Sequence, residues 1–275
     1  MDYIELNMPL EGEMAEILTA ELSDFPFVSF KQEGPTLKAY IPQEKLVDCK
    51  EEVDRLLASY AVEGVRYISI ESQNWNALWE SNFTPVDVDG KLYIRAPFHA
   101  PAPEGEMEVV IMPKMSFGTG HHATTCLVSG YLMELALAGK RGLDMGSGTG
   151  VLAIVAVKCG AEAVDAVDID TWADENCREN IASNGVADRI TPILGDARAI
   201  AGRSYDFIAA NINRNILVGD MAAYVKAMNA GADLGMSGFL EADIPIIRSA
   251  AEAEGLLFVS SRLRDGWAAV HCKKR

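Results

Sequence analysis

The feature that most restricts how this chain can fold is a glycine-rich segment near its middle. Residues 143–150 read Leu-Asp-Met-Gly-Ser-Gly-Thr-Gly, and the apolar run Val151 to Cys159 follows directly. Alternating glycines let a backbone turn tightly, approach a ligand closely and point several N–H groups outward. The segment therefore predicts a strand, a tight turn and a helix, with a nucleotide-like ligand that carries a carboxylate or a phosphate.

The spacing of these glycines separates the kinds of nucleotide-binding loop. A dinucleotide-binding fingerprint requires glycine at position 151, where this chain has Val151, and the Gly-Lys-Ser/Thr ending of a P-loop is absent. What remains is Asp-x-Gly-x-Gly-x-Gly, with glycines at Gly146, Gly148 and Gly150. Taken by itself, the loop also fits a turn that only connects a strand to a helix.

Polar residues stand where three further predicted strands end. An acid about 20 residues beyond the glycine loop is placed to accept hydrogen bonds from ribose hydroxyls, and Asp168 is the first candidate. Asp170 is the second, although it is also suited to cap the predicted helix Thr171–Ser183. Polar strand ends in series are typical of the carboxyl-end crevice of an open α/β sheet. The strands and the residues that follow them are Ala163–Val167 with Asp168, Arg189–Leu194 with Gly195 and Asp196, and Ser204–Ala210 with Asn211.

Composition narrows the class of protein. A chain of 275 residues, 49% of them hydrophobic and 23% charged, indicates one large or two modest globular domains. The longest apolar runs are too short to span a bilayer, and the first residues lack the pattern of a signal peptide, so we expect no membrane association. Five cysteines without a C-x-x-C pair favour reduced thiols in the cytoplasm, and four histidines give no metal-ligand pattern.

The formal net charge of −16 indicates which classes of molecule the protein can bind. Binding to phosphates requires clustered lysine and arginine, so the charge argues against nucleic acid as the direct substrate. An acidic enzyme attracts a basic partner, but acidity that only keeps a protein soluble explains the charge equally well.

Residues 1–70 predict a small domain of their own. Their pattern gives the order βαββαβ, which is the ferredoxin-like arrangement. The domain contains no catalytic constellation, and we expect it to bind a partner. The predicted elements are strands at Asp2–Met8, Phe25–Lys31, Thr36–Ile41 and Val65–Ile70, and helices at Glu11–Ser23 and Gln43–Tyr60.

Residues 71–110 are expected to join this domain to a second one at 111–275. Trp75, Trp79 and Phe83 are four residues apart and would form one aromatic stripe on a helix, where core packing or docking between domains is their expected role. Lys91–Arg95 and Met107–Ile111 alternate like strands.

A second informative segment is Ser116–Thr125, Ser-Phe-Gly-Thr-Gly-His-His-Ala-Thr-Thr. Glycines on both sides of Thr119 predict a mobile loop, and together with Phe117 this loop is placed to close over a site and exclude water. Thr124 and Thr125 begin an apolar helix that runs to about Leu137, and one of them is a candidate for its N-cap. His121 and His122 are expected to pack in the loop rather than to act as general bases.

Together these motifs resemble one family across essentially the whole chain. Phe-Gly-Thr-Gly-x-His-x-Thr-Thr from Phe117, Asp-x-Gly-x-Gly-x-Gly from Asp144, Val-Asp-Ile-Asp from Val167 and Ala-Asn-Ile from Ala210 are similar to the bacterial ribosomal protein L11 methyltransferases. The resemblance implies a doubly wound, mostly parallel, seven-stranded class I methyltransferase sheet preceded by a ferredoxin-like α+β domain. It also implies transfer of methyl groups from S-adenosylmethionine to lysine side-chain and N-terminal amines of one large-subunit ribosomal protein. We expect this partner to be basic and the chain to be a monomer, although the sequence does not reveal the oligomeric state.

Site residues follow from the same resemblance. It implies that Asn211 positions the substrate amine or binds the cofactor, and the sequence does not choose between these roles. Gly238 and Trp267 also match the family, whereas Trp79-Glu80, Ala96-Pro97-Phe98 and Asn213-Arg214-Asn215 depart from it. The residues implied or expected to contact the cofactor are Thr125, Gly146, Gly148, Gly150, Asp168, Asp196, Asn211, Phe117 and Thr119.

Two other functions remain open at this point. One is a class I methyltransferase that acts on another protein or on a small amine. The other is a ribosome-associated binding module that keeps a cofactor pocket without catalysis. The glycines at 146, 148 and 150 are all present, which argues against a pocket that has lost its function.

Overall fold

The computed structural model describes residues 3–70, 83–114 and 118–275. The chain divides into two compact units, Met1–Asn82 and Phe83–Arg275. Trp75, Trp79 and Phe117, which were assigned roles from the sequence, lie outside the described residues. In the part of the chain that is described, no helix is long and apolar enough to cross a membrane.

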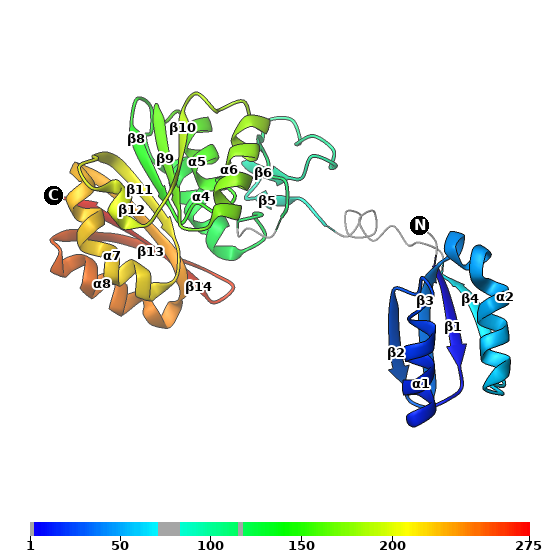
Figure 1. Ribbon diagram of the computed structural model, residues 1–275. Helices are drawn as coiled ribbons and strands as arrows, with labels where there is room; N and C mark the ends of the chain where they lie inside the picture. The colour runs from blue at the N-terminus through cyan, green and yellow to red at the C-terminus, as the bar shows by residue number, and fades with distance from the viewer. Residues whose placement is uncertain (1–2, 71–82, 115–117) are drawn as a thin grey trace. The chain divides into compact units, whose positions relative to one another are not determined.

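The first unit is a four-stranded antiparallel sheet with two helices on one face (Figure 1). Its strands stand in the order β2-β3-β1-β4, and its core contains Leu6, Leu18 and Val53. This arrangement confirms the ferredoxin-like prediction. The elements are β1 (Tyr3–Met8), α1 (Glu13–Leu22), β2 (Ser29–Glu33), β3 (Thr36–Pro42), α2 (Gln43–Ser59) and β4 (Arg66–Ile70).

The strand predicted at Phe25–Lys31 is displaced in the structure, where β2 begins at Ser29. Pro26 has no N–H to donate to a strand ladder. Phe25 and Phe27 instead pack against the apolar core of the unit. The alternating aromatic residues that suggested a strand are therefore a core-packing turn, and the prediction was wrong for residues 25–28.

The second unit is built on a seven-stranded sheet in the order β10-β9-β8-β11-β12-β14-β13, in which only β14 runs antiparallel to its neighbours. This confirms the predicted doubly wound class I methyltransferase sheet. A smaller sheet, β5-β6-β7, precedes it. The strands are β5 (Val86–Val88), β6 (Leu92–Arg95), β7 (Met107–Val110), β8 (Arg141–Met145), β9 (Ala163–Asp168), β10 (Ile190–Leu194), β11 (Tyr205–Asn211), β12 (Met228–Leu240), β13 (Leu256–Arg264) and β14 (Trp267–Lys274).

Helices cover both faces of this sheet (Figure 1). One apolar cluster joins the sheet to α4, α5 and α6, and a second joins it to α7 and α8. Residues 151–157 of α5 are all buried, which is why the sequence there is apolar without a helical period. The helices are α4 (Ala123–Glu134), α5 (Val151–Lys158), α6 (Thr171–Ser183), α7 (Arg214–Ala227) and α8 (Ile244–Ala253), with short 3₁₀ turns η1 (Ala197–Ile200) and η2 (Glu241–Asp243).

The strand order reverses between β8 and β11. From β8 the chain continues outward through β9 to β10, whereas β11 continues in the other direction to β12. In open α/β sheets, ligands bind at such a switch point, outside the carboxyl ends of the strands. The glycine-rich segment follows β8 directly, so the fold places it at this point.

Candidate active site

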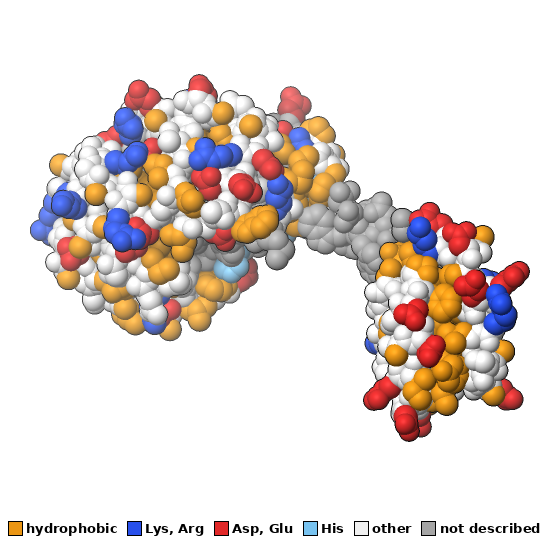
Figure 2. Space-filling model, in the orientation of Figure 1, with side chains coloured by type: hydrophobic (Ala, Val, Ile, Leu, Met, Phe, Trp, Pro, Cys, Tyr) orange, Lys and Arg blue, Asp and Glu red, His pale blue; other side chains and the backbone are white. Residues whose placement is uncertain are grey.

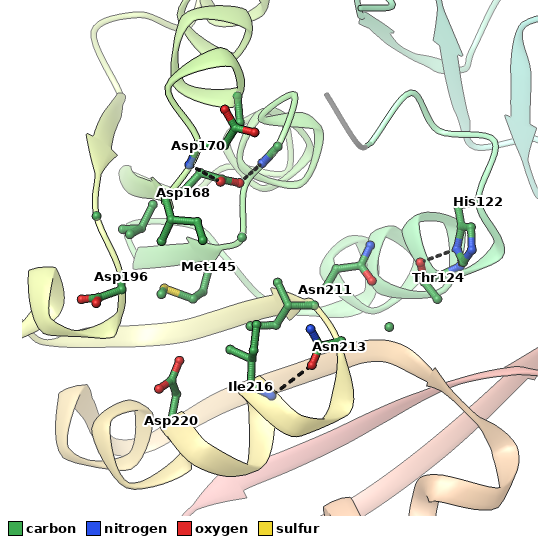
Figure 3. Close-up of a pocket in the computed structure, with 18 of the residues that line it drawn as sticks. His122, Thr124, Met145, Asp168, Asp170, Asp196, Asn211, Asn213, Ile216 and Asp220 are labelled. Atoms are coloured by element: carbon green, nitrogen blue, oxygen red, sulfur yellow. Dashed lines mark hydrogen bonds between the residues drawn. The ribbon is translucent and has the colours of Figure 1, made fainter. Parts of the chain in front are cut away.

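A cavity of about 650 Å³ opens at the carboxyl ends of β8, β9 and β11. The predicted residues Gly146, Gly148, Asp168, Asp196 and Asn211 all line it (Figure 3). They come from four different strand ends, as the sequence predicted. The structure therefore brings most of the predicted site residues into one cavity.

The glycine loop forms one wall of the cavity. Gly146, Gly148 and Gly150 all have positive φ, of 73°, 53° and 78°, a conformation that costs other residues free energy. A Cβ atom at Gly146 would lie 2.1 Å from the Ile212 side chain, so glycine is also required for space. Gly150 caps α5 and packs against Cys177 instead of lining the cavity. Its role is to support the loop.

Asp144, at the end of β8, holds this loop from beneath. It is almost fully buried, and its Oδ2 accepts the Ala153 N–H at 3.0 Å, in the first turn of α5. Its Oδ1 has no hydrogen-bond partner among the described residues. Burial, helped by the nearby charge of Asp168 and opposed by the hydrogen bond from Ala153, raises the pKa of this carboxyl to about 7. Sequence reasoning assigned Asp144 no role of its own, because burial cannot be read from the motif.

We predict that Asp144→Asn removes a pH dependence of stability. In the folded chain the carboxyl keeps its proton up to about pH 7, whereas in the unfolded chain it loses it near 3.8. Between these values the folded state binds more protons, so the free energy of unfolding of the wild type should fall as the pH rises. Urea unfolding at about pH 5 and about pH 8 should show the variant gaining stability relative to the wild type at the higher pH. A difference that does not change with pH would contradict the burial argument.

The Asp168 carboxylate is fixed by two backbone groups. Gly148 donates its N–H to Oδ2 at 2.8 Å, and Asp170 donates its N–H to Oδ1 at 3.0 Å. Asp170 itself caps α6 by accepting the Trp172 N–H at 2.8 Å. The capping role that the sequence allowed for Asp170 is confirmed, and Asp168 is the acid that the glycine loop orients at the cavity.

The end of β11 presents an amide to the cavity. Asn211 donates through Nδ2 to the hydroxyl of Thr125 at 3.5 Å, and Thr125 is completely buried. The Asn211 Oδ1 atom is also buried and has no hydrogen-bond partner among the described residues. Thr125 therefore does not line the cavity but holds the Asn211 side chain. A buried carbonyl oxygen without a partner is costly unless a ligand supplies a donor.

The start of α4 differs from the prediction. The N-cap is His122, not a threonine: its Nδ1 accepts the Thr124 N–H, and the Thr124 hydroxyl lies 2.7 Å from the same atom. The His122 ring also lies 4.5 Å from the Trp267 ring, at the edge of the cavity. Histidine is uncommon at an N-cap, so the residue type alone does not favour His122 over the neighbouring threonines.

The loop before α4 is tied to the segment that precedes β5 and to the glycine loop. The Thr119 hydroxyl lies 3.2 Å from His121 Nδ1, and His121 Nε2 lies 2.7 Å from the Thr84 carbonyl oxygen. Thr149 donates its hydroxyl to the Gly118 carbonyl at 2.7 Å. His121 thus packs within the loop, as predicted. Thr119 does not line the cavity.

Comparison with known proteins decides which family this site belongs to. The family model described as ribosomal protein L11 methyltransferase (PrmA) matches residues 15–275. The chain belongs to this family. Family members are methyltransferases, and their methyl donor is S-adenosylmethionine.

Individual relatives agree with the family match. A ribosomal protein L11 methyltransferase of Porphyromonas gingivalis is 44% identical over 261 residues, which covers 93% of this chain and 89% of the relative. One from Bacteroides fragilis is 42% identical over 279 residues, covering 98% of this chain and 99% of the relative. The crystal structure of a ribosomal protein L11 methylase from Lactobacillus delbrueckii subsp. bulgaricus has a TM-score of 0.64 and 24% identity, over 70% of this chain and 100% of that one. This last likeness supports the fold alone.

The cavity fits S-adenosylmethionine as a methyl donor. Aspartates at 168, 170, 196 and 220 line it and no lysine or arginine does, which suits a ligand with a cationic sulfonium and an ammonium group. The N-terminus of α5 lies beneath the glycine loop and favours a carboxylate. The Asn211 Oδ1 atom offers an acceptor for an amine. No group of three or more histidine, cysteine or acidic side chains suited to a metal ion is found in the described residues.

Proposed function

We propose that this methyltransferase transfers methyl groups from S-adenosylmethionine to amines of the large-subunit ribosomal protein L11 in the cytoplasm. The acceptors are lysine side chains and the N-terminal amine. Relatives that span nearly the whole chain carry the name of this activity, which supports the choice of substrate. The observation that carries the choice of an amine is the buried, unpartnered Oδ1 of Asn211 in the cavity wall.

The cofactor supplies an electrophilic methyl group on a positively charged sulfur. The acceptor must be a neutral amine, although a free lysine has a pKa of about 10.4. The Asn211 Oδ1 atom accepts a hydrogen bond from the amine and fixes the direction of its lone pair. The nearby rings of His122 and Trp267 exclude water, which lowers the pKa of the amine by desolvation. This chain therefore needs no dedicated general base.

The remaining polar groups position the donor. The Asp168 carboxylate, preoriented by the N–H groups of Gly148 and Asp170, accepts hydrogen bonds from the ribose hydroxyls. Positioning dominates the catalysis of an in-line displacement, so these groups act by holding the donor and the amine in line.

We predict that Asp168→Ala weakens binding of S-adenosylmethionine by about 1.5–3 kcal/mol, the range for charge-assisted hydrogen bonds. The fold should survive because Asp168 stands at a strand end rather than in the core. Calorimetric titration measures the affinity, and Asp170→Asn, which keeps an N-cap side chain on α6, is the matched control. An unchanged affinity in a folded Asp168→Ala protein would refute the ribose assignment.

The first unit supplies substrate recognition in this proposal. Residues 1–30 contain seven acidic residues and no lysine or arginine, and acidic side chains are prominent on the visible face of the unit (Figure 2). Such a surface attracts a basic ribosomal protein.

The test of the proposal uses methyl-labelled cofactor and two forms of the purified ribosomal protein. Label should enter the untreated protein and should be lost when all its amines are acetylated beforehand, because acetylation removes the acceptor lone pair. Label in the acetylated protein would exclude amine methylation. Binding of cofactor without labelling of either form would favour a methyltransferase with another substrate or a non-catalytic module.

A further inference from the structure

One carboxylate of the cavity wall, Asp220, lies outside the sequence motifs of the site. Asp220 lies on α7, one turn beyond Ile216, and both residues line the cavity. Its Oδ2 atom accepts the hydroxyl of Tyr224 at 3.4 Å, and Tyr224 is completely buried. A buried phenol thus restrains the Asp220 carboxylate at the cavity wall. Nothing in the sequence singles out this residue.

The position of Asp220 assigns it to one end of the cavity. Figure 3 shows Asp196 and Asp220 at the same end, whereas Asn211, Thr124 and His122 lie at the other. The contact of α7 with η1, the turn that follows Asp196, agrees with this view. With the amine acceptor at the Asn211 end and the ribose on Asp168, the purine of the donor falls at the Asp196 and Asp220 end. This inference rests on the ribose assignment proposed above.

Asp196 is poorly suited to bind the purine edge by itself. Its two carboxylate oxygens accept from Arg198 Nε at 3.0 and 2.9 Å, and Oδ1 also accepts the Arg198 backbone N–H at 2.9 Å. Its charge is therefore neutralised and most of its lone pairs are used. Asp220 differs, because no lysine or arginine forms an ion pair with it in the described residues, and its side-chain partner there is the neutral Tyr224 hydroxyl. It is the stronger acceptor at this end.

The apolar walls at this end suit a flat ring. Ile169 is 71% exposed and Ile216 is 42% exposed, although both line the cavity beside the buried Met145 side chain. Large apolar side chains exposed around a cavity mark a surface that a ligand covers. A purine between them leaves its edge toward the carboxylates, which accept hydrogen bonds but cannot donate them.

We propose that Asp220 is a specificity residue that accepts a hydrogen bond from the exocyclic amine of the purine and so selects a 6-amino over a 6-oxo purine. A 6-oxo group presents an oxygen to the carboxylate, and this contact is repulsive. Asp220→Asn replaces one acceptor oxygen by an N–H₂ donor of nearly the same shape. The amide can then turn its oxygen toward a 6-amino group or its N–H₂ toward a 6-oxo group. The variant therefore loses the preference for a 6-amino purine but still has a polar side chain that can hydrogen-bond to the Tyr224 hydroxyl.

The test compares S-adenosylhomocysteine with its deaminated analogue S-inosylhomocysteine, in which the 6-amino group is replaced by a 6-oxo group and N1 carries a proton. The two have the same net charge, so the ratio of their dissociation constants removes the general effect of deleting a carboxylate. Calorimetric titration of the full chain should show that the wild type prefers the adenosyl ligand by about tenfold or more, the value of one hydrogen bond to a charged group. In Asp220→Asn the ratio should fall by about tenfold.

Asp196→Asn is the matched control, because it changes a second carboxylate at the same end of the cavity. We expect the ratio of the two dissociation constants in Asp196→Asn to stay close to that of the wild type. A ratio that is unchanged in Asp220→Asn, or that collapses only in Asp196→Asn, overturns the proposal. Failure of the wild type to bind S-adenosylhomocysteine would instead count against the cofactor site itself. Thermal unfolding of each variant shows that the folds being compared are intact.

Discussion

Replacement of Asn211 by alanine should lower the turnover number of methyl transfer by about 100-fold, the effect expected when a reacting group is misplaced by about 1 Å. Asn211 Oδ1 is buried and without a partner among the described residues, so in the working enzyme a ligand amine must satisfy it. Affinity for S-adenosylmethionine should change much less than turnover. If affinity falls while turnover at saturation holds, Asn211 binds the cofactor only.

Replacing Asn211 by aspartate separates two effects on the acceptor amine, its orientation by an oxygen at this position and the lowering of its pKa. Asn211→Asp keeps the acceptor oxygen but adds a negative charge, which favours the protonated form of the acceptor lysine and raises its pKa. The turnover number near pH 7 should therefore fall, and it should recover as the pH is raised until the lysine loses its proton. The alanine variant should not recover, because it lacks the acceptor. A pH–rate profile of Asn211→Asp parallel to that of the wild type would contradict this account of amine activation.

Removal of the first unit should abolish most methylation of the intact ribosomal protein, by about 100-fold or more, while leaving cofactor binding nearly normal. A shortened chain that begins at Gln73 keeps every residue that lines the cavity. It loses the acidic surface that we propose to hold the substrate, so the entropy of placing a flexible lysine is no longer offset by remote binding.

Two measurements make this result interpretable. Titration with S-adenosylmethionine must first show that the shortened chain is folded and binds the donor, since exposed core would mimic a loss of recognition. In the full chain, methylation should also fall as salt is raised, because electrostatic attraction between acidic and basic surfaces is screened. A folded, donor-binding shortened chain with the wild-type rate would show that substrate recognition lies in the second unit.

Much of the fold was predictable because its signals are local. Glycines at 146, 148 and 150 mark a turn that other residues cannot form, and the strand ends at Asp168 and Asn211 identify the crevice. The error at residues 25–28 has the opposite origin. There the aromatic pattern reflects packing against helices, and Pro26 overrides strand propensity.

The parts of the site that could not be predicted depend on tertiary contacts. Thr125 supports Asn211 from a buried position, which a motif does not distinguish from direct contact with the cofactor. Asp144 acquires its raised pKa only when the sheet and α5 enclose it. Asp220 reaches the cavity because α7 packs beside η1, and no spacing in the sequence records that contact. The sequence thus predicted where the cavity lies, whereas the structure shows which side chains line it and which support it from behind.

Tandem mass spectrometry of the substrate locates the transferred methyl groups and so tests amine methylation directly. Purified large-subunit ribosomal protein L11 is incubated with the full-length wild-type chain and S-adenosylmethionine, with Asn211→Ala as the control. We expect methyl groups on lysine side chains and on the N-terminal amine in the wild-type reaction, and far fewer in the control. Methyl groups on carboxylates or on amides, or an unmodified protein in the presence of bound cofactor, would contradict amine methylation.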